Sequence, residues 1–358
     1  MRPAPPVVLV TGAGGFVGGH VARALAATGA YRVRGLVRRP PATGPGDPPI
    51  DWEFGDLRDP AVRSRALAGA RFVIHCASWV RLGHDPSGLS RAVNVDATRG
   101  LLGGAEAAGV ERFVYTSTLQ TLAAGTAGRP ADEDAAWNLE PVRSPYSDTK
   151  REAEALVLAA SSGRMATLAL CPGMAIGPRD PGPTSSRVLL EFSRSPVAVL
   201  PGGGIPVVEV EVLAGAHVRA LERGEPGRRY AVVGPYLSYR RQAEIVAAVS
   251  GRPRRIWTVP DGAARPLAWL AGGIDRAAGG RWLSISRAVV AGGFLRFHVD
   301  GSRADRVLGL EHGPPVEAIR RTLAAARDSG LAPWLLGKDL RDDTEGPARI
   351  DGPEPPGA

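Results

Sequence analysis

The stretch from Val7 to Gly18 reads VVLVTGAGGFVG, and it decides the fold. An apolar run, Val7 to Val10, leads into a glycine-rich segment and then into a helical pattern from His20 to Thr28. This order predicts a strand, a tight turn and a helix. The glycines at positions 12, 15 and 18 would let the backbone turn, let a pyrophosphate approach the bare main chain, and let the helix pack closely on the strand. The first N–H groups of the helix would then face the phosphates.

Composition indicates a globular chain. With 358 residues, 44% hydrophobic and 22% charged, the length allows one large α/β unit or a main domain with a smaller lobe. The formal charge of +8 arises almost entirely from arginine, because Lys150 and Lys338 are the only lysines. The arginines are scattered and not interleaved with aromatic residues, so we expect no nucleic-acid partner. We also expect no metal site.

The two cysteines, Cys76 and Cys171, each end an apolar strand-like run and could be neighbours in a parallel sheet. Two thiols make no disulfide framework, and no signal peptide precedes the first strand, so a cytoplasmic location is expected. The apolar stretches Ala263 to Ile274 and Ile285 to Phe297 are interrupted by Arg, Asp or paired Gly. They are too short or too broken to span a bilayer.

A second strand is predicted from Tyr31 to Val37, and it ends in Arg38 and Arg39. A fold that binds NAD usually places an acidic side chain here for the ribose 2′-hydroxyl, yet the first acidic residue of the chain is Asp47. The two arginines offer charge-assisted bonds to a 2′-phosphate. NADP is therefore expected in preference to NAD, although two more arginines in an arginine-rich chain could also be incidental.

The segments after the third and fourth predicted strands supply further cofactor candidates. Asp56 and Leu57 follow the strand Trp52 to Phe54, where Asp56 either accepts from the adenine amino group or caps the next helix. The strand Phe72 to His75 is followed by small residues, Ala77 and Ser78, that let the backbone approach a ligand. We interpret His75 as a packed strand-end residue. The loop from Trp79 to Gly88 is predicted to form one wall of a substrate pocket, and Asn94 interrupts the helix Arg91 to Ala108.

Catalytic candidates follow the fifth strand, Phe113 to Tyr115. The hydroxyls of Ser117 and Thr118 lie at its end, where such a run is also typical of turns. Tyr146 and Lys150 are four residues apart, so they share one face of the predicted helix. A compact ammonium beside a phenol can lower the pKa of the phenol and bond a ribose hydroxyl, which a planar guanidinium does poorly.

The strict alternation of strands and helices ends after the sixth strand, Thr167 to Leu170, which leads into Pro172 and Gly173. That rigid, bare backbone suits contact with a flat ring. We predict an NAD(P)-binding domain over residues 6–180, a mixed substrate lobe over 181–335 in which about 214–250 returns to the main sheet, and a disordered tail over 336–358. The returning part comprises a helix from Ala214 to Arg223 and a strand from Tyr230 to Val233; further helices are predicted at Gln242 to Val249 and Val316 to Asp328.

These motifs, in this chain order, resemble the extended short-chain dehydrogenase/reductase superfamily, which includes the NAD-dependent epimerase/dehydratase family. Segments such as GDLRDP (55–60), HCAS (75–78) and NVDATRGLL (94–102) look most like its dihydroflavonol-4-reductase-like and hopanoid-associated sugar epimerase-like branch, with the 3β-hydroxysteroid dehydrogenases as near relatives. The resemblance implies an α/β fold, a Rossmann-type doubly wound parallel sheet with a smaller C-terminal α/β substrate lobe. It implies a catalytic pair, Tyr146 and Lys150, and a cofactor site made by Gly12, Gly15, Phe16, Val17, Gly18, Arg38, Arg39, Asp56, Leu57, Ala77, Ser78, Lys150, Pro172 and Gly173.

The chain departs from the family pattern at three places. The catalytic serine of the family aligns with Thr118, and Ser117 is the residue before it. Near Met174 the chain has the Pro-Gly form similar to ketone reductases, where sugar-nucleotide epimerases usually carry asparagine. The stretch from Glu209 to Leu213 replaces a His-Val-Asp-Asp-Val sequence, which puts the usual helix start in doubt.

The resemblance implies an NADP-dependent reductase or dehydrogenase acting on a carbonyl or secondary alcohol of a mid-sized, partly apolar small molecule. Tyr146 would exchange a proton with the substrate oxygen, Lys150 would lower the pKa of Tyr146 and bind the nicotinamide ribose, and Thr118 with Ser117 would bond the same oxygen. Two alternatives remain open: a nucleotide-sugar epimerase or dehydratase, and a redox-sensing or RNA-binding member of the fold without turnover. Homodimer formation is left open as well.

Overall fold

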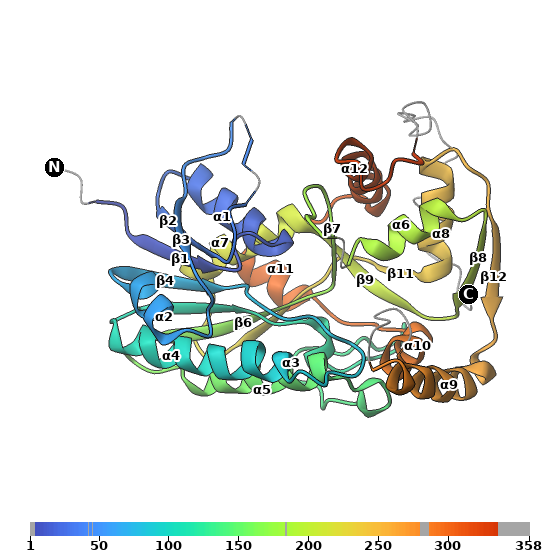
Figure 1. The fold of residues 1–358 in the computed structure, drawn as a ribbon, viewed down its shortest axis with the longest axis horizontal. Coiled ribbons are helices and arrows are strands. Elements are labelled where there is room, and N and C mark those ends of the chain that lie inside the picture. The colour runs from blue at the N-terminus through green and yellow to red at the C-terminus, as the bar shows by residue number, and fades with distance from the viewer. Residues whose placement is uncertain (1–3, 42, 45, 183–184, 280–285, 336–358) are drawn as a thin grey trace.

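The main layer is a seven-stranded sheet in which every neighbouring pair is parallel, in the order β3-β2-β1-β4-β5-β6-β10 (Figure 1). The computed structural model describes residues 4–41, 43–44, 46–182, 185–279 and 286–335. The chain runs outward from β1 to β3 and then crosses back to β4, so the strand order reverses between β1 and β4. Ligands bind at such a reversal in open α/β sheets. The strands are β1 (Val7–Thr11), β2 (Arg32–Val37), β3 (Asp51–Phe54), β4 (Ala70–His75), β5 (Arg112–Thr116), β6 (Ala166–Pro172) and β10 (Arg229–Val232).

Helices cover both faces of this sheet (Figure 1). Neighbouring residues of β1 point to opposite faces: Val10 packs in a core with Leu25 and Leu213, whereas Leu9 packs in another with Leu101 and Val157. Burial on both faces explains why these strands read as continuous apolar runs, and the predicted doubly wound fold is confirmed. One face carries α1 (Phe16–Ala27), α7 (Val210–Arg223) and α11 (Ser302–Leu308), and the other carries α2 (Pro60–Leu67), α4 (Ala97–Ala107) and α5 (Pro145–Ala159).

The turn between β1 and α1 depends on glycine at two positions. Gly12 has a φ of +68°, and a Cβ there would lie 2.8 Å from the backbone of Ala77. A Cβ on Gly18 would lie 2.3 Å from the carbonyl oxygen of Gly12, so any side chain would push α1 off the strand end. The helix begins at Phe16, before the predicted start at His20, because its glycine-rich first turn carries no apolar periodicity.

A second lobe is built on two small sheets (Figure 1). One is three-stranded, in the order β11-β9-β7, and the other pairs β12 with β8. Its core joins Leu189, Val246 and Leu323 from three helices. Sequence analysis missed β7, β11 and β12, which have three to five residues each. The elements are β7 (Met174–Ile176), β8 (Val197–Pro201), β9 (Gly204–Glu209), β11 (Tyr236–Ser238), β12 (Arg255–Val259), α6 (Arg187–Arg194), α8 (Tyr239–Val249) and α12 (Pro315–Asp328).

Helix α7 begins at Val210, four residues before the predicted start at Ala214. The two carboxylates that replace the family sequence, Glu209 and Glu211, both pair with Arg321 of α12, the latter at 3.2 Å. The altered stretch therefore still starts a helix. Its acidic residues attach the last helix of the second lobe to the first turn of α7.

Cys76 and Cys171 are not neighbours, because β5 lies between the strands that lead to them. The tail over 336–358 lies outside the described residues.

The remaining helices of the described residues are α3 (Leu89–Arg91), a π-helix (Ala92–Asp96), α9 (Ala264–Ala277) and α10 (Arg287–Gly293), with short 3₁₀ turns at Leu119–Thr121, Glu140–Val142 and Asp261–Ala263. Within the described ranges, no helix combines the length and apolar character needed to cross a membrane.

Candidate active site

A cleft of about 840 Å³ lies at the carboxyl ends of β1, β2 and β4, beside the glycine turn. Its position matches the strand-order reversal, where a dinucleotide would bind. Eight predicted cofactor residues line it: Gly12, Gly15, Arg38, Arg39, Asp56, Leu57, Ala77 and Ser78.

The other predicted cofactor residues support the cleft from behind or lie elsewhere. Phe16 is buried in the core, and Val17 packs against the same core. Gly18 lets α1 approach the carbonyl of Gly12. Gly173, after Pro172, packs against the second lobe instead: a Cβ there would lie 2.5 Å from the Pro206 carbonyl oxygen.

The end of β2 presents two cations to the cleft. Arg38 and Arg39 are exposed, and neither forms an ion pair within the described part of the chain. Asp56 is held by Arg58 through contacts of 3.0 and 2.8 Å, and this pairing lowers the pKa of Asp56 to about 2. The capping alternative for Asp56 is wrong, because Asp59 caps α2 by accepting from the backbone of Ala61.

Asn94 ties the cleft to the candidate catalytic helix. It is buried in the π-helix, a local irregularity that often marks functional sites. Its side-chain oxygen accepts from the Trp79 backbone at 2.7 Å and from the Ser78 hydroxyl at 3.1 Å. Its side-chain nitrogen donates to Thr149 at 3.0 Å. Asn94 interrupts the apolar pattern of its helix, and this interruption is the feature of the sequence that indicates a specific role for it.

Tyr146 stands in the first turn of α5. A reciprocal capping arrangement of Ser144 and Ser147 fixes this turn. The Tyr146 backbone donates to the Arg81 carbonyl at 3.2 Å, so the loop predicted as a pocket wall lies against it. Burial raises the pKa of Tyr146, and a side-chain hydrogen bond with Thr118 opposes the rise. The structure thus brings Tyr146 and Thr118 together.

Lys150 lies one helical turn further along α5 and is 1% exposed. Its Nζ donates to the Thr116 carbonyl at 2.6 Å and lies 4.1 Å from the centre of the Tyr115 ring. Burial lowers the pKa of Lys150 to about 7. The raised pKa of Tyr146 is opposite to the direction expected from a neighbouring ammonium, because burial has the largest effect on it. Lys150 itself faces the end of β5.

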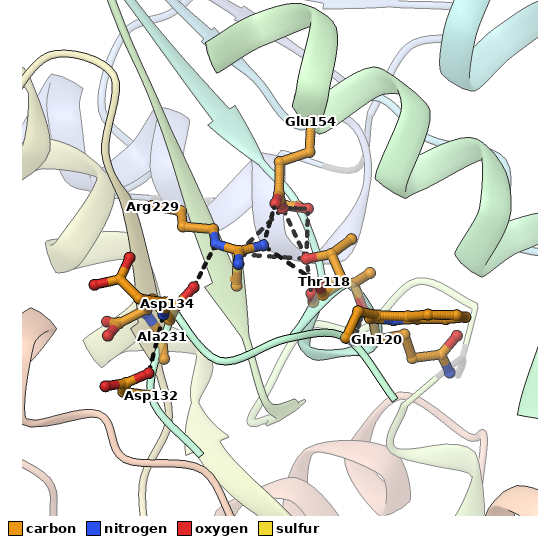
Figure 2. A network of polar contacts seen from close by, with 12 residues as sticks. Thr118, Gln120, Asp132, Asp134, Glu154, Arg229 and Ala231 are labelled. Atoms are coloured by element: carbon orange, nitrogen blue, oxygen red, sulfur yellow. Dashed lines mark hydrogen bonds and ion pairs between the residues drawn. The ribbon is translucent and has the colours of Figure 1, made fainter. Parts of the chain in front are cut away.

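Ser117 takes part in a buried polar network around Glu154 and Arg229, and Figure 2 shows these two residues. Its hydroxyl donates to Glu154, which also accepts from Thr121 at 2.7 Å and pairs with Arg229 at 3.1 Å. Ser117 is 3% exposed, so its hydroxyl serves this network. Of the two predicted hydroxyls, Thr118 is the one that lowers the pKa of Tyr146.

Arg229 links Glu154 to the loop around Glu133 (Figure 2). Its Nε donates to the Glu133 carbonyl at 2.7 Å, while the Glu133 side chain accepts from the Ala231 backbone at 2.9 Å. The network therefore connects α5, the end of β5 and β10. Sequence analysis missed both Glu154 and Arg229, because a charged residue in a helix or at a strand start usually faces solvent.

Two buried histidines support the strand ends. His75 bonds Thr11 at 2.6 Å and Thr98 at 2.8 Å, and Thr11 in turn accepts from the Ala77 backbone at the cleft. His75 is fully buried, which confirms it as a packed residue. Burial lowers the pKa of His75 to about 3. On the other face, His217 bonds Thr116 at 2.7 Å, and burial lowers the pKa of His217 to about 4.

Replacing His217 with glutamine is expected to flatten the acid limb of the stability curve. The pKa of His217 is about 4 when folded, below its unfolded value of 6.5. Between these values the unfolded chain binds a proton that the native chain does not, so stability falls as pH falls. Denaturant unfolding at pH 7 and pH 4.5 should show a loss about 2 to 3 kcal/mol smaller in the variant. The exposed His84→Gln serves as the control, and an unchanged slope in His217→Gln would contradict the assignment.

Among the described residues, no group of three or more His, Cys, Asp or Glu side chains is placed to hold a metal ion. The cleft beside the glycine turn has the features of a dinucleotide site. A glycine turn, a helix start and two unpaired arginines line one cleft.

Comparison with known proteins agrees with the geometry. The NAD dependent epimerase/dehydratase family matches residues 8–232. A putative dihydroflavonol 4-reductase of Synechocystis sp. is 31% identical over 326 residues, covering 88% of this chain and 92% of that protein. Sterol demethylase protein B of Methylococcus capsulatus is 28% identical over 273 residues, covering 75% and 82%. The crystal structure of gox2253 superposes with a TM-score of 0.74 at 30% identity and covers 90% of this chain and 98% of that one. The resemblance found in the sequence is thus confirmed, and the chain belongs to the NAD-dependent epimerase/dehydratase family.

Proposed function

We propose that this protein is an NADP-preferring oxidoreductase that interconverts a ketone and a secondary alcohol on a mid-sized, partly apolar molecule. The observation that carries the proposal is the first turn of α5, where Tyr146 lies near Thr118 and its backbone donates to the Arg81 carbonyl of the loop beside the cleft. Asn94 joins that helix to the lining of the cleft. Named relatives include reductases, and the family name includes epimerases; hydride transfer through a nicotinamide cofactor is the chemistry that both share.

In this proposal each side chain has one task. Tyr146 donates its phenolic proton to the substrate oxygen during reduction and takes it back during oxidation. Thr118 donates a hydrogen bond to the same oxygen and fixes its position. Lys150 supplies a positive charge, held against the Thr116 carbonyl, at the end of β5. A bound nicotinamide cofactor would supply the hydride.

Replacing both Arg38 and Arg39 with alanine is expected to weaken NADPH binding far more than NADH binding. Each charge-assisted bond to a 2′-phosphate contributes roughly 1.5 to 3 kcal/mol, so the double variant should lose about 10² to 10⁴ in NADPH affinity. NADH, which has no such phosphate, should change less than about threefold. Fluorescence titration of both cofactors measures the two affinities.

The matched control is Arg71→Ala. Arg71 is also exposed, but it lies at the opposite end of the sheet and pairs with Glu111 at 2.8 Å. It should leave both affinities unchanged. Equal losses of affinity for NADPH and NADH in the double variant would contradict the cofactor preference. The oxidoreductase activity is tested separately, by the turnover of substrate.

The activity itself is tested by screening ketones and secondary alcohols with NADPH and NADH, following the absorbance of the reduced nicotinamide. Net turnover of added cofactor supports a reductase. An epimerase or dehydratase would retain its cofactor through purification and convert nucleotide sugars without net consumption. A protein that binds cofactor and converts none of these substrates would support the sensing alternative.

A further inference from the structure

We propose that the end of the second lobe formed by β8, β12 and α9 docks on the surface of an anionic lipid bilayer. Figure 1 shows these elements together at the right-hand end of the molecule, where β12 leads into α9 through a 3₁₀ turn. The proposal is independent of the enzymatic activity, because it concerns binding alone.

Exposed apolar side chains are concentrated at this end. Of the nine large hydrophobic residues that are exposed in the described part of the chain, six lie on β8, β12 or α9. Trp257 is 65% exposed and Trp269 75%. Single exposed apolar residues are ordinary, but a cluster of this kind marks an interaction surface. The six are Val197, Val199, Trp257, Leu267, Trp269 and Leu270.

The outer face of the two-stranded sheet carries exposed apolar residues beside Arg255. Ala198 and Leu200 of β8 point into the core, whereas Val197 and Val199 between them are exposed. Val199 pairs in register with Trp257 of β12, so these two side chains share the outer face. A solvent-facing sheet surface normally carries polar residues at these positions. The pattern therefore indicates a face that is covered in use.

Helix α9 has the same property. Its buried residues, among them Ala268, Ala271 and Asp275, lie along one side. The exposed side of the helix contains Leu267, Trp269 and Leu270. Its charged residues, Arg265 and Arg276, lie near the two ends of the helix. A helix of this kind lies in the plane of a membrane interface, with tryptophan at the level of the headgroups.

The charges around the surface favour an anionic partner. Arg255, Arg265 and Arg276 are exposed and form no ion pair within the described ranges. The nearby carboxylates are already engaged: Asp261 pairs with Arg296 at 2.9 Å, and Asp275 is buried and accepts from the His84 backbone at 2.8 Å. Cations beside exposed tryptophan and leucine suit acidic lipid headgroups over an apolar layer.

A second copy of the chain fits this surface less well. A two-fold contact places the same patch on both subunits, so each cationic patch would face another cationic patch in which Asp261 and Asp275 already have partners. A bilayer of acidic lipid can contact the apolar residues with its hydrocarbon layer and the arginines with its headgroups. Because Asp275 of α9 holds the loop beside Tyr146, docking would also set the candidate active site close to the bilayer.

The test is vesicle flotation of the full chain with phosphatidylglycerol mixed into phosphatidylcholine, and with phosphatidylcholine alone. We expect binding to the acidic vesicles that weakens with salt, together with a blue shift of tryptophan fluorescence. Trp257→Ser combined with Trp269→Ser should reduce binding by at least about tenfold. Replacing Arg255, Arg265 and Arg276 with glutamine should reduce it about fivefold per residue on acidic vesicles only.

Phe54→Ser is the matched control, because Phe54 is 49% exposed on β3 of the main sheet. It should bind like the wild type. All substituted residues are exposed, and thermal unfolding checks that each variant is folded. Equal flotation of the tryptophan variant and the wild type would overturn the proposal. The proposal would also be overturned if the wild type bound no vesicles and formed a dimer, and the tryptophan variant were a monomer. That result would assign the surface to a second copy of the chain.

Discussion

Tyr146→Phe is expected to lower kcat by roughly 10² to 10⁴ while NADPH affinity stays within about twofold of the wild type. The substitution removes one oxygen and keeps the ring, so the first turn of α5 should remain intact. Phenylalanine cannot transfer a proton to the substrate oxygen. Steady-state rates and cofactor titration on the same preparation separate the loss of chemistry from a loss of binding.

The control is Tyr31→Phe, the same chemical change at a site remote from the cleft. Tyr31 loses only an exposed hydrogen bond of 3.1 Å to Glu222, so its rate should equal that of the wild type. A pH profile gives a second check, because burial raises the pKa of Tyr146. Reduction needs the protonated phenol, so the alkaline limb that reports Tyr146 should lie above that of a tyrosine of ordinary pKa. It should be separate from the limb near pH 7 at which the Lys150 ammonium is lost. Full activity of Tyr146→Phe would remove Tyr146 from the mechanism.

The main sheet could be predicted because its strands are buried on both faces. Runs such as Val7 to Val10 and Phe72 to Ile74 are apolar throughout. A run of this kind indicates a buried strand from the sequence alone, because it does not depend on how the residues alternate. The short strands of the second lobe lack it. β7 has three residues, and β12 exposes Trp257 where an outward residue is normally polar, so neither pattern indicates a strand.

The candidate site was predictable where residue identity alone is informative. Lys150 stands out because arginine fills nearly every other cationic position. The choice between Ser117 and Thr118 was not predictable, because it depends on which hydroxyl meets Glu154, 37 residues further along the chain. Arg229, 75 residues beyond Glu154, shows the same limit. Contacts across such separations exist only after the sheet has formed.

Glu154→Gln is expected to reduce the free energy of unfolding by about 3 to 5 kcal/mol. The carboxylate is 4% exposed and accepts from the hydroxyls of Ser117 and Thr121. Glutamine keeps the size but turns an amide donor toward these donors and toward Arg229, which then loses its charged partner. Denaturant unfolding measures the loss. Glu152→Gln on the same helix is the matched control: its exposed pairs with Arg91 and Arg99 should contribute less than about 1 kcal/mol.

A second consequence of Glu154→Gln separates an electrostatic role from packing. Among the charges near Lys150, Glu154 is the one that most raises the pKa of Lys150, which burial holds at about 7. Removing the negative charge should lower the pKa of Lys150 further, so the ammonium is lost at lower pH and the activity limb that depends on it moves toward acid. Glu154→Asp retains the charge and should keep that limb near its original pH even if stability falls. If Glu154→Gln and Glu154→Asp gave the same pH profile, the carboxylate would act only by filling space, and Lys150 would owe its charge to the Thr116 carbonyl and the Tyr115 ring.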